Sequence, residues 1–248
     1  MACIFTGILK AAISFMNKII VANWKMRPDT LAEAEDLYQA SSGAVVCPPF
    51  IYLEELAKIK SGAILGTQDI SLELSGEMLK QFGVKYAIIG HSDRRHKLGE
   101  TDEVVNRKLK LALSYDLIPI VCVGEKSRND DFKAFLQNQV LATFNGLSAE
   151  QIEKCLIAYE PVWAISTTPG SRPDTPESAI ESIGVIKKTL IGNWDLKIEN
   201  FLFLYGGSVT SKNVADFLKE DEIKGVLVGG VSINKEEFKK ILEIASNV

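Results

Sequence analysis

From Lys18 onward, short runs of β-branched and other apolar residues alternate with longer segments whose apolar residues recur every three or four positions. The short runs are typical of strands buried on both faces, and the longer segments of amphipathic helices. The predicted strands are Ile19–Ala22, Ala44–Cys47, Ala63–Leu65, Tyr86–Ile89, Ile118–Val123, Leu156–Tyr159, Phe201–Tyr205 and Gly225–Val228. The predicted helices are Leu31–Ala40, Tyr52–Ile59, a short one near Glu77–Phe82, Glu103–Tyr115, Phe132–Phe144, Pro176–Ile191, Val214–Lys219 and Lys235–Ala245.

This order of elements predicts an α/β fold, a single closed (β/α)8 barrel with a parallel eight-stranded sheet ringed by helices. No linker-like or low-complexity segment interrupts the series, so we expect one catalytic domain over residues 16–248. Residues 1–15 are predicted to be an N-terminal extension, because Met16 offers an alternative start. They lack the basic start of a signal peptide, and Lys10 interrupts the apolar run.

Composition and short motifs limit which partners, metals and cofactors this protein can be expected to bind. The net charge of −4 and the lack of a basic run argue against nucleic acid or an anionic membrane as a partner. Buried-looking cysteines at Cys47, Cys122 and Cys155, with no C-x-x-C pair, are typical of reduced thiols in a cytoplasmic protein. His91 and His96 are the only histidines, so a centre built from many histidines is excluded. The chain also lacks the glycine motifs of dinucleotide-binding and P-loop proteins.

Candidate chemistry lies where the predicted strands end. The residues just past the carboxyl ends of barrel strands face one common rim, which is where barrel enzymes carry their active sites. The polar and glycine residues at these positions are Asn23, Lys25, Gln68, Gly90, His91, Ser92, Gly124, Glu125, Glu160, Gly206, Gly207, Ser208, Gly229 and Gly230. The sequence therefore predicts that a lysine, a histidine and a glutamate meet at one mouth.

Glu160 ends the strand at Leu156–Tyr159 and precedes Pro161, which turns the chain where the carboxylate emerges. The apolar run 162–165 then predicts a segment that packs over the site as a lid, and burial beneath it would make the carboxylate a stronger base. A structural alternative stays open: Glu160 paired with a lysine at a strand end. Taken singly, Lys25 can equally be a surface lysine and His91 a structural histidine.

Six motifs follow one another along the chain: N-W-K at Asn23–Lys25, I-I-G-H-S-D-R-R at Ile88–Arg95, C-V-G-E at Cys122–Glu125, A-Y-E-P-V-W-A-I at Ala158–Ile165, Y-G-G-S-V at Tyr205–Val209 and L-V-G-G at Leu227–Gly230. In this order they resemble the triosephosphate isomerase family, and the resemblance covers the chain from about Met16 to its end. The resemblance implies a TIM barrel that interconverts dihydroxyacetone phosphate and glyceraldehyde 3-phosphate through an enediolate. It implies a cytoplasmic enzyme of glycolysis and gluconeogenesis with no metal and no cofactor.

The resemblance also implies roles. Glu160 matches the family's base, His91 its neutral electrophile, Lys25 the cation that faces the developing oxyanion, and Asn23 the polar neighbour. A phosphate dianion is expected on backbone N–H groups near a helix start, and the residues expected there are Ser166, Ser208, Gly229 and Gly230, together with Asn23 and Lys25. The residues expected to support the site are Ser92, Asp93, Glu125, Trp163 and Tyr205. We further expect Glu125 and Arg94 to form an ion pair beneath the site.

Three departures from the family pattern carry expectations of their own. Asp93 stands where the family usually has glutamate, so we expect a lengthened contact with Lys25. The lid has Ser166 where the family has glycine, and a longer tail with Pro169 and Pro173 before a helix start at Thr175. The connection after the third strand is shorter than is usual in the family and keeps only L-S-G-E at Leu74–Glu77. We therefore expect a monomer, or a weaker homodimer that uses a different surface.

Two other functions remain open from the sequence. The altered lid is compatible with a catalytically silent barrel that binds a sugar phosphate without turnover. A related phosphate-binding barrel that acts on a larger sugar is the other alternative, although it predicts a roomier mouth than a lid carrying Trp163 allows.

Overall fold

The computed structural model describes residues 18–71, 76–196 and 201–248. Its strands form a closed, all-parallel barrel in which β1 pairs with both β2 and β8. The strands are β1 (Ile19–Asn23), β2 (Val45–Cys47), β3 (Ile64–Thr67), β4 (Tyr86–Ile89), β5 (Ile118–Val123), β6 (Leu156–Tyr159), β7 (Leu202–Tyr205) and β8 (Ile223–Val228). The predicted (β/α)8 barrel is therefore confirmed.

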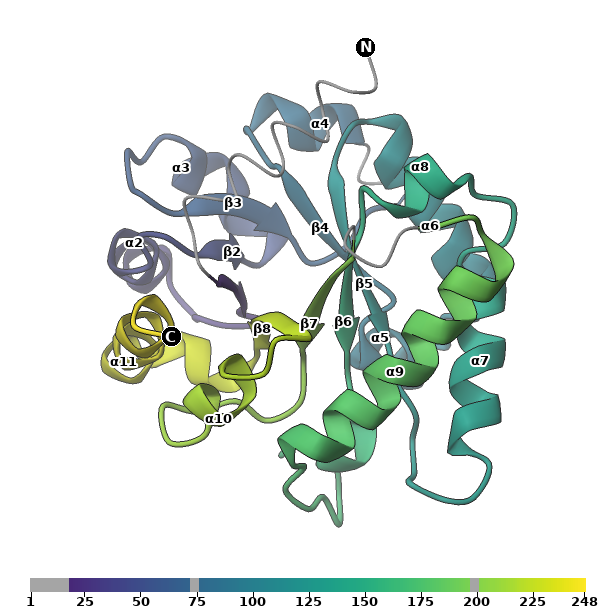
Figure 1. The fold of residues 1–248 in the computed structure, drawn as a ribbon. Helices are drawn as coiled ribbons and strands as arrows, with labels where there is room; N and C mark the ends of the chain where they lie inside the picture. Colours follow the sequence, from purple (N-terminus) through teal and green to yellow (C-terminus); the bar gives the residue numbers. More distant parts are fainter. Residues whose placement is uncertain (1–17, 72–75, 197–200) are drawn as a thin grey trace.

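Helices surround the strands, as Figure 1 shows. The α-helices are α2 (Leu31–Ala40), α3 (Leu53–Ala57), α4 (Gly76–Gln81), α5 (Ser92–Lys97), α6 (Asp102–Ser114), α7 (Phe132–Thr143), α8 (Ala149–Ile152), α9 (Pro176–Asn193), α10 (Val214–Leu218) and α11 (Lys235–Ser246). The 3-10 turns among the described residues are η1 (Phe50–Tyr52), η2 (Val162–Ala164) and η4 (Gly230–Ile233).

Side-chain caps fix where several helices start. Thr30 caps α2 and forms a capping box with Glu33, and Thr101 caps α6 by accepting a hydrogen bond from Val104 N. Thr175 caps α9, as predicted, and Pro176 occupies the first turn, where its missing N–H costs nothing. The predicted helix Tyr52–Ile59 is instead divided between η1 and α3. The short helices α5 and α8 were not predicted, because segments of so few residues show no helical period.

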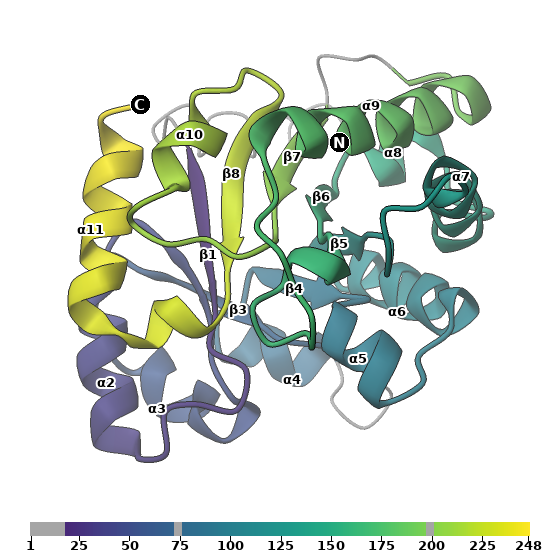
Figure 2. The same cartoon turned by 90° about the horizontal axis from the view of Figure 1, so that it is seen from below.

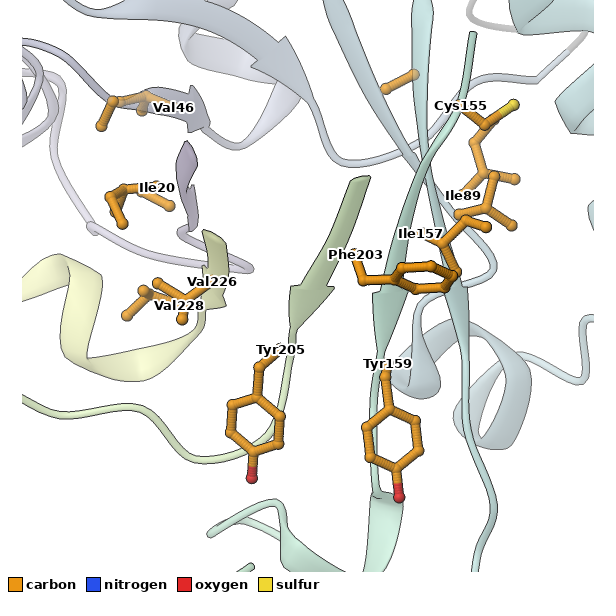
Figure 3. Close-up of a cluster of buried hydrophobic side chains, with 14 of the residues drawn as sticks. Ile20, Val46, Ile89, Cys155, Ile157, Tyr159, Phe203, Tyr205, Val226 and Val228 are labelled. Atoms are coloured by element: carbon orange, nitrogen blue, oxygen red, sulfur yellow. The ribbon is translucent and has the colours of Figure 1, made fainter. Parts of the chain in front are cut away.

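Alternation along the strands divides the core into two layers. Residues such as Val21, Ile88 and Ala158 pack inside the barrel, and their neighbours in sequence pack between strands and helices. Figure 3 shows part of the outer layer, with Tyr159 and Tyr205 side by side on paired strands. Because Ala158 faces inward and Tyr159 outward, Glu160, the first residue after β6, faces the barrel mouth.

Some predictions fall partly outside the described residues. The boundary between residues 15 and 16 does so entirely, and the single domain of residues 16–248 stays a prediction. Of the short connection Leu74–Glu77, residues 74 and 75 are outside, whereas residues 76 and 77 begin α4. In the part of the chain that is described, no helix combines the length and apolarity needed to cross a membrane.

Candidate active site

Strands β1, β4 and β6 bring the candidate catalytic side chains together at one end of the barrel. Asn23 is the last residue of β1, His91 follows β4 by one glycine, and Glu160 follows β6 directly. All three are buried, with 4%, 6% and 3% of their surface exposed, respectively. Figure 2 shows the connection between β6 and α9, the predicted lid, as a green loop that crosses in front of β4 in this view. The expected convergence at one mouth is therefore present.

The carboxylate of Glu160 is held by two donors from the β4 side. Its Oε2 accepts a hydrogen bond from Ser92 N at 2.9 Å, and its Oε1 lies 3.2 Å from His91 Nε2. Its backbone N–H donates to Val123 O at 2.8 Å, which continues the pairing of β6 with β5. A Cβ at Gly206 would lie 2.9 Å from Glu160 Cγ, so glycine at that position makes room for this side chain.

His91 caps α5, and this position decides its tautomer. Its Nδ1 accepts a hydrogen bond from Asp93 N at 3.1 Å, so the proton of the neutral ring is on Nε2, the atom that faces Glu160. Burial lowers the pKa of His91, and although the charge of Glu160 opposes this shift, the net direction is downward. His91 is thus a neutral hydrogen-bond donor in the mouth.

Lys25 adds the cation of the site. Its backbone adopts a left-handed conformation with φ of 54°, and its carbonyl accepts a hydrogen bond from Gln68 Nε2 at 2.7 Å. Its N–H donates to Asn23 Oδ1 at 3.1 Å, so Asn23 fixes the turn that carries the lysine. Nζ of Lys25 lies 2.7 Å from Asp93 Oδ2.

The expected lengthening of the contact between Asp93 and Lys25 is therefore wrong. The long, flexible lysine side chain reaches the shorter carboxylate at ordinary ion-pair distance. Burial alone would raise the pKa of Asp93, but hydrogen bonds from Lys25 and Lys97 outweigh burial and hold the pKa well below its usual range. The carboxylate stays charged and keeps Lys25 in place.

Glu125 supports the base from below. Its Oε1 accepts hydrogen bonds from Tyr159 OH and Trp163 Nε1, both at 2.8 Å, and these residues flank Glu160 in sequence. The Val162 N–H also donates to the Glu125 carbonyl at 3.0 Å. Glu125 therefore holds the chain on both sides of the carboxylate that carries the candidate chemistry.

The predicted ion pair between Glu125 and Arg94 is wrong. Arg128 is the cation beside Glu125, at 3.5 Å. Arg94 lies on α5 and binds Asp69 at 2.8 Å and Glu100 at 2.7 Å instead. Spacing in the sequence could not separate these options, because each arginine follows a rim motif. Arg94 points along α5 towards Asp69 and Glu100, whereas Arg128 lies in the loop between β5 and α7, beside Glu125.

A buried charge cluster that we did not predict fixes α5. Lys108 Nζ lies 2.6 Å from Asp69 Oδ2 and 2.5 Å from Glu100 Oε1, the same two carboxylates that bind Arg94. Because α5 starts beside His91 and carries Arg94, this cluster ties the histidine to β3 and α6. The available signal was an aspartate four residues beyond the third predicted strand, Ala63–Leu65, and a lysine within an apolar helical face.

The expected phosphate-binding residues surround the other side of the mouth. Ser166 N donates to Ser208 Oγ at 2.8 Å, and that hydroxyl donates to the Ala164 carbonyl at 2.9 Å. The Ser166 N–H thus already has a partner, the Ser208 hydroxyl in the connection after β7. Gly229 lies between β8 and η4, and Gly230 is the first residue of η4. A Cβ at Gly230 would meet nothing within 4 Å, and one at Gly229 would lie 3.6 Å from Lys25 Cε.

Tyr205 supports the lid from β7. Burial raises its pKa, and the neighbouring carboxylate of Asp174, in the lid tail, adds to the shift.

Within the described ranges, no group of three or more His, Cys, Asp or Glu side chains is arranged to hold a metal ion. The side chains that meet at the mouth are a buried carboxylate, a neutral imidazole and the amine of Lys25.

Fold and site define a class, a (β/α)8-barrel protein with an acid–base site at the carboxyl ends of its strands. Comparison with known proteins identifies the family. The family model "Triosephosphate isomerase" matches residues 18–245. The triosephosphate isomerase of Caldanaerobacter subterraneus subsp. tengcongensis is 42% identical over 246 residues, covering 90% of this chain and 98% of that protein. Those of Dictyoglomus thermophilum and Thermoanaerobacter pseudethanolicus are 40% and 39% identical, covering 91% and 90% of this chain and 98% of each relative. The chain belongs to the triosephosphate isomerase family.

Proposed function

We propose that this protein interconverts dihydroxyacetone phosphate and D-glyceraldehyde 3-phosphate by proton transfer through an enediolate. The observation that carries the proposal is the contact of a buried carboxylate, Glu160, with a neutral imidazole, His91, at the mouth of the barrel. Family membership makes these triose phosphates the substrates to test first.

The reaction needs a base above the carbon and donors at the oxygen where charge develops. Glu160 takes the proton from the carbon next to the carbonyl and returns it to the neighbouring carbon. The Nε2–H of His91 polarises the carbonyl and passes protons between the two oxygens. Lys25, held by Asp93, faces the developing negative charge, and Asn23 positions Lys25.

Glu160 must move for this chemistry to occur. In the structure its carboxylate engages both Ser92 N and His91 Nε2, so a substrate carbonyl competes for the imidazole N–H. Rotation of the Glu160 side chain frees His91 and brings the carboxylate over the substrate carbon. Closure of the lid then excludes water from the carboxylate and the substrate carbon.

The phosphate dianion is proposed to lie on backbone N–H groups rather than on a cluster of cations. Gly229 and Gly230 begin the turn that follows β8, and the space beside the Gly230 backbone is open. The Ser166 N–H completes the cradle once it exchanges its Ser208 partner for a phosphate oxygen. This arrangement lets an acidic protein hold an anion with local groups.

A coupled assay with glyceraldehyde 3-phosphate tests the function. The wild-type chain is expected to turn over, and Glu160→Gln to lower kcat by about a thousandfold, because the amide cannot accept the proton. Glu150→Gln, on the exposed first turn of α8, is the matched control and is expected to behave as wild type. Binding of 2-phosphoglycolate by the wild type without turnover would instead support the catalytically silent barrel, which nothing in the geometry favours.

We propose a monomer, or a homodimer weaker than is usual in the family, that works in the cytoplasm. The short connection that includes Leu74–Glu77 supports the weaker association. The three described cysteines are free and buried, which fits a reducing compartment. Sedimentation over a range of concentrations tests the oligomeric state, and a tight dimer at nanomolar concentration would contradict it.

A further inference from the structure

The two ends of the lid (residues 162–175) are in contact with each other. Arg172, in the lid tail, donates a backbone hydrogen bond to the Trp163 carbonyl at 3.2 Å. Its guanidinium carbon lies 5.0 Å from the centre of the Trp163 ring, within the range of a cation–π interaction. Ten residues along the chain thus form a loop that is closed by one residue pair.

The other edge of the same indole reaches the catalytic machinery. Trp163 donates its Nε1–H to Glu125 Oε1, the atom that also accepts the Tyr159 hydroxyl. Tyr159 and Trp163 flank Glu160, so the position of the indole bears directly on the base. A group that fixes the indole therefore also affects the position of Glu160, through the hydrogen bond between Trp163 and Glu125.

Arg172 is free to play this part. No described carboxylate lies within ion-pair distance of its guanidinium, whereas Arg128, on the far side of Glu125, is bound by Glu181 and Glu125. The side chain of Arg172 is exposed, so its contact with Trp163 does not serve to bury the arginine. Pro169 and Pro173 restrict the tail on both sides of it.

We propose that Arg172 is a positioning residue. Its contact with the face of Trp163 holds the two ends of the lid together and keeps Glu160 in the position that proton transfer requires. This inference rests on the proposed function for its kinetic consequences only. Arg172 is not assigned a contact with the substrate, because the phosphate-binding groups named above lie on other residues. Loss of the contact between Arg172 and Trp163, here called the clamp, lets the first turn of the lid move independently of its tail. This movement affects lid closure and the position of Glu160.

The test compares Arg172→Met, which keeps the length and loses the charge, with Arg172→Lys, which keeps a cation. Arg172→Met is expected to lower kcat about fivefold, while inhibition by inorganic phosphate changes less than twofold. Arg172→Lys is expected to restore at least half of the activity. In a Trp163→Leu background, Arg172→Met is expected to cause no further loss, because the arginine acts through the indole.

Fluorescence gives a readout that needs no turnover. The emission of Trp163, taken as the difference between the wild type and Trp163→Phe, is expected to change in Arg172→Met and to recover in Arg172→Lys. Additive losses in the double variant, or weaker phosphate inhibition in Arg172→Met, would overturn the proposal. An inactive wild type with an intact fluorescence response would refute the proposed function and leave the clamp standing, so the two failures are distinguishable.

Discussion

His91 Nε2 lies 3.2 Å from Glu160 Oε1, while the other ring nitrogen of His91 is occupied by the Asp93 N–H. In this pair, His91 is a neutral hydrogen-bond donor, and Glu160 is a buried carboxylate that can accept a proton. Both side chains are more than nine-tenths buried, so neither exchanges freely with water. The site therefore holds a proton donor and a proton acceptor in contact before substrate binds.

The imidazole of His91 is expected to stay neutral at pH 6.5, its ordinary pKa, and somewhat below, because burial lowers the pKa. The unfolded chain binds a proton near that pH whereas the native protein does not, so stability falls as the pH drops from about 6.5 towards the native pKa. Carbon-13 NMR of the Cε1 positions checks this directly, and His91→Gln assigns the signal because the chain has only two histidines. A His91 signal that titrates at or above pH 6.5 would contradict the neutral electrophile.

Loss of the Asp93 charge is expected to loosen Lys25. Asp93→Asn removes the ion pair at 2.7 Å and should raise KM about five- to tenfold, with a smaller loss in kcat. Asp93→Glu, which restores the usual family residue, is the matched control and is expected to stay within twofold of wild type. Because the pKa of Asp93 is lowered in the native state, its stabilising effect is present above pH 4 and is lost as the pH falls further. Equal KM values for the wild type and Asp93→Asn would show that Lys25 needs no partner.

Gly230→Ala tests the phosphate cradle without a folding defect. A Cβ at this position meets nothing within 4 Å, so the melting temperature is expected to stay near that of the wild type. If the phosphate lies on this backbone, the methyl group occupies its place and KM rises by about tenfold or more. Gly192→Ala, which also meets open space but lies near the end of α9, is the control and leaves kinetics unchanged. An unaltered KM in Gly230→Ala would move the phosphate elsewhere on the rim.

The buried cluster around Lys108 is expected to be a major source of stability. Lys108→Met leaves the carboxylates of Asp69 and Glu100 with only Arg94 as a cation, and breaking a buried ion pair in this way costs about 3–5 kcal/mol. Urea unfolding measures this loss. Lys110→Met, on the exposed face of the same helix, serves as the control and should change the free energy of unfolding by no more than about 0.5 kcal/mol. Equal midpoints for the two variants would mean that the cluster contributes no net stability.

Much of the fold could be predicted from the sequence because its determinants are local or periodic. Continuous apolar runs such as Ile118–Val123 predict buried strands, and the segments that follow threonine caps predict helices. Eight such units in a chain of this length favour a closed barrel. Barrel geometry then places Lys25, His91 and Glu160 on one rim, because all strands are parallel. The sequence by itself thus determined the architecture and the set of residues that share the mouth.

Only the tertiary structure decided which groups contact one another within that mouth. It assigned Arg128 rather than Arg94 to Glu125, preserved the contact of Asp93 with Lys25 and placed Arg172 over Trp163. These outcomes depend on the directions of long side chains and on the path of the lid. Neither is encoded in a hydrophobic period, because a charged side chain selects its partner by distance and burial in three dimensions. The sequence determined which residues meet at the mouth, and packing determined the bonds that each of them makes.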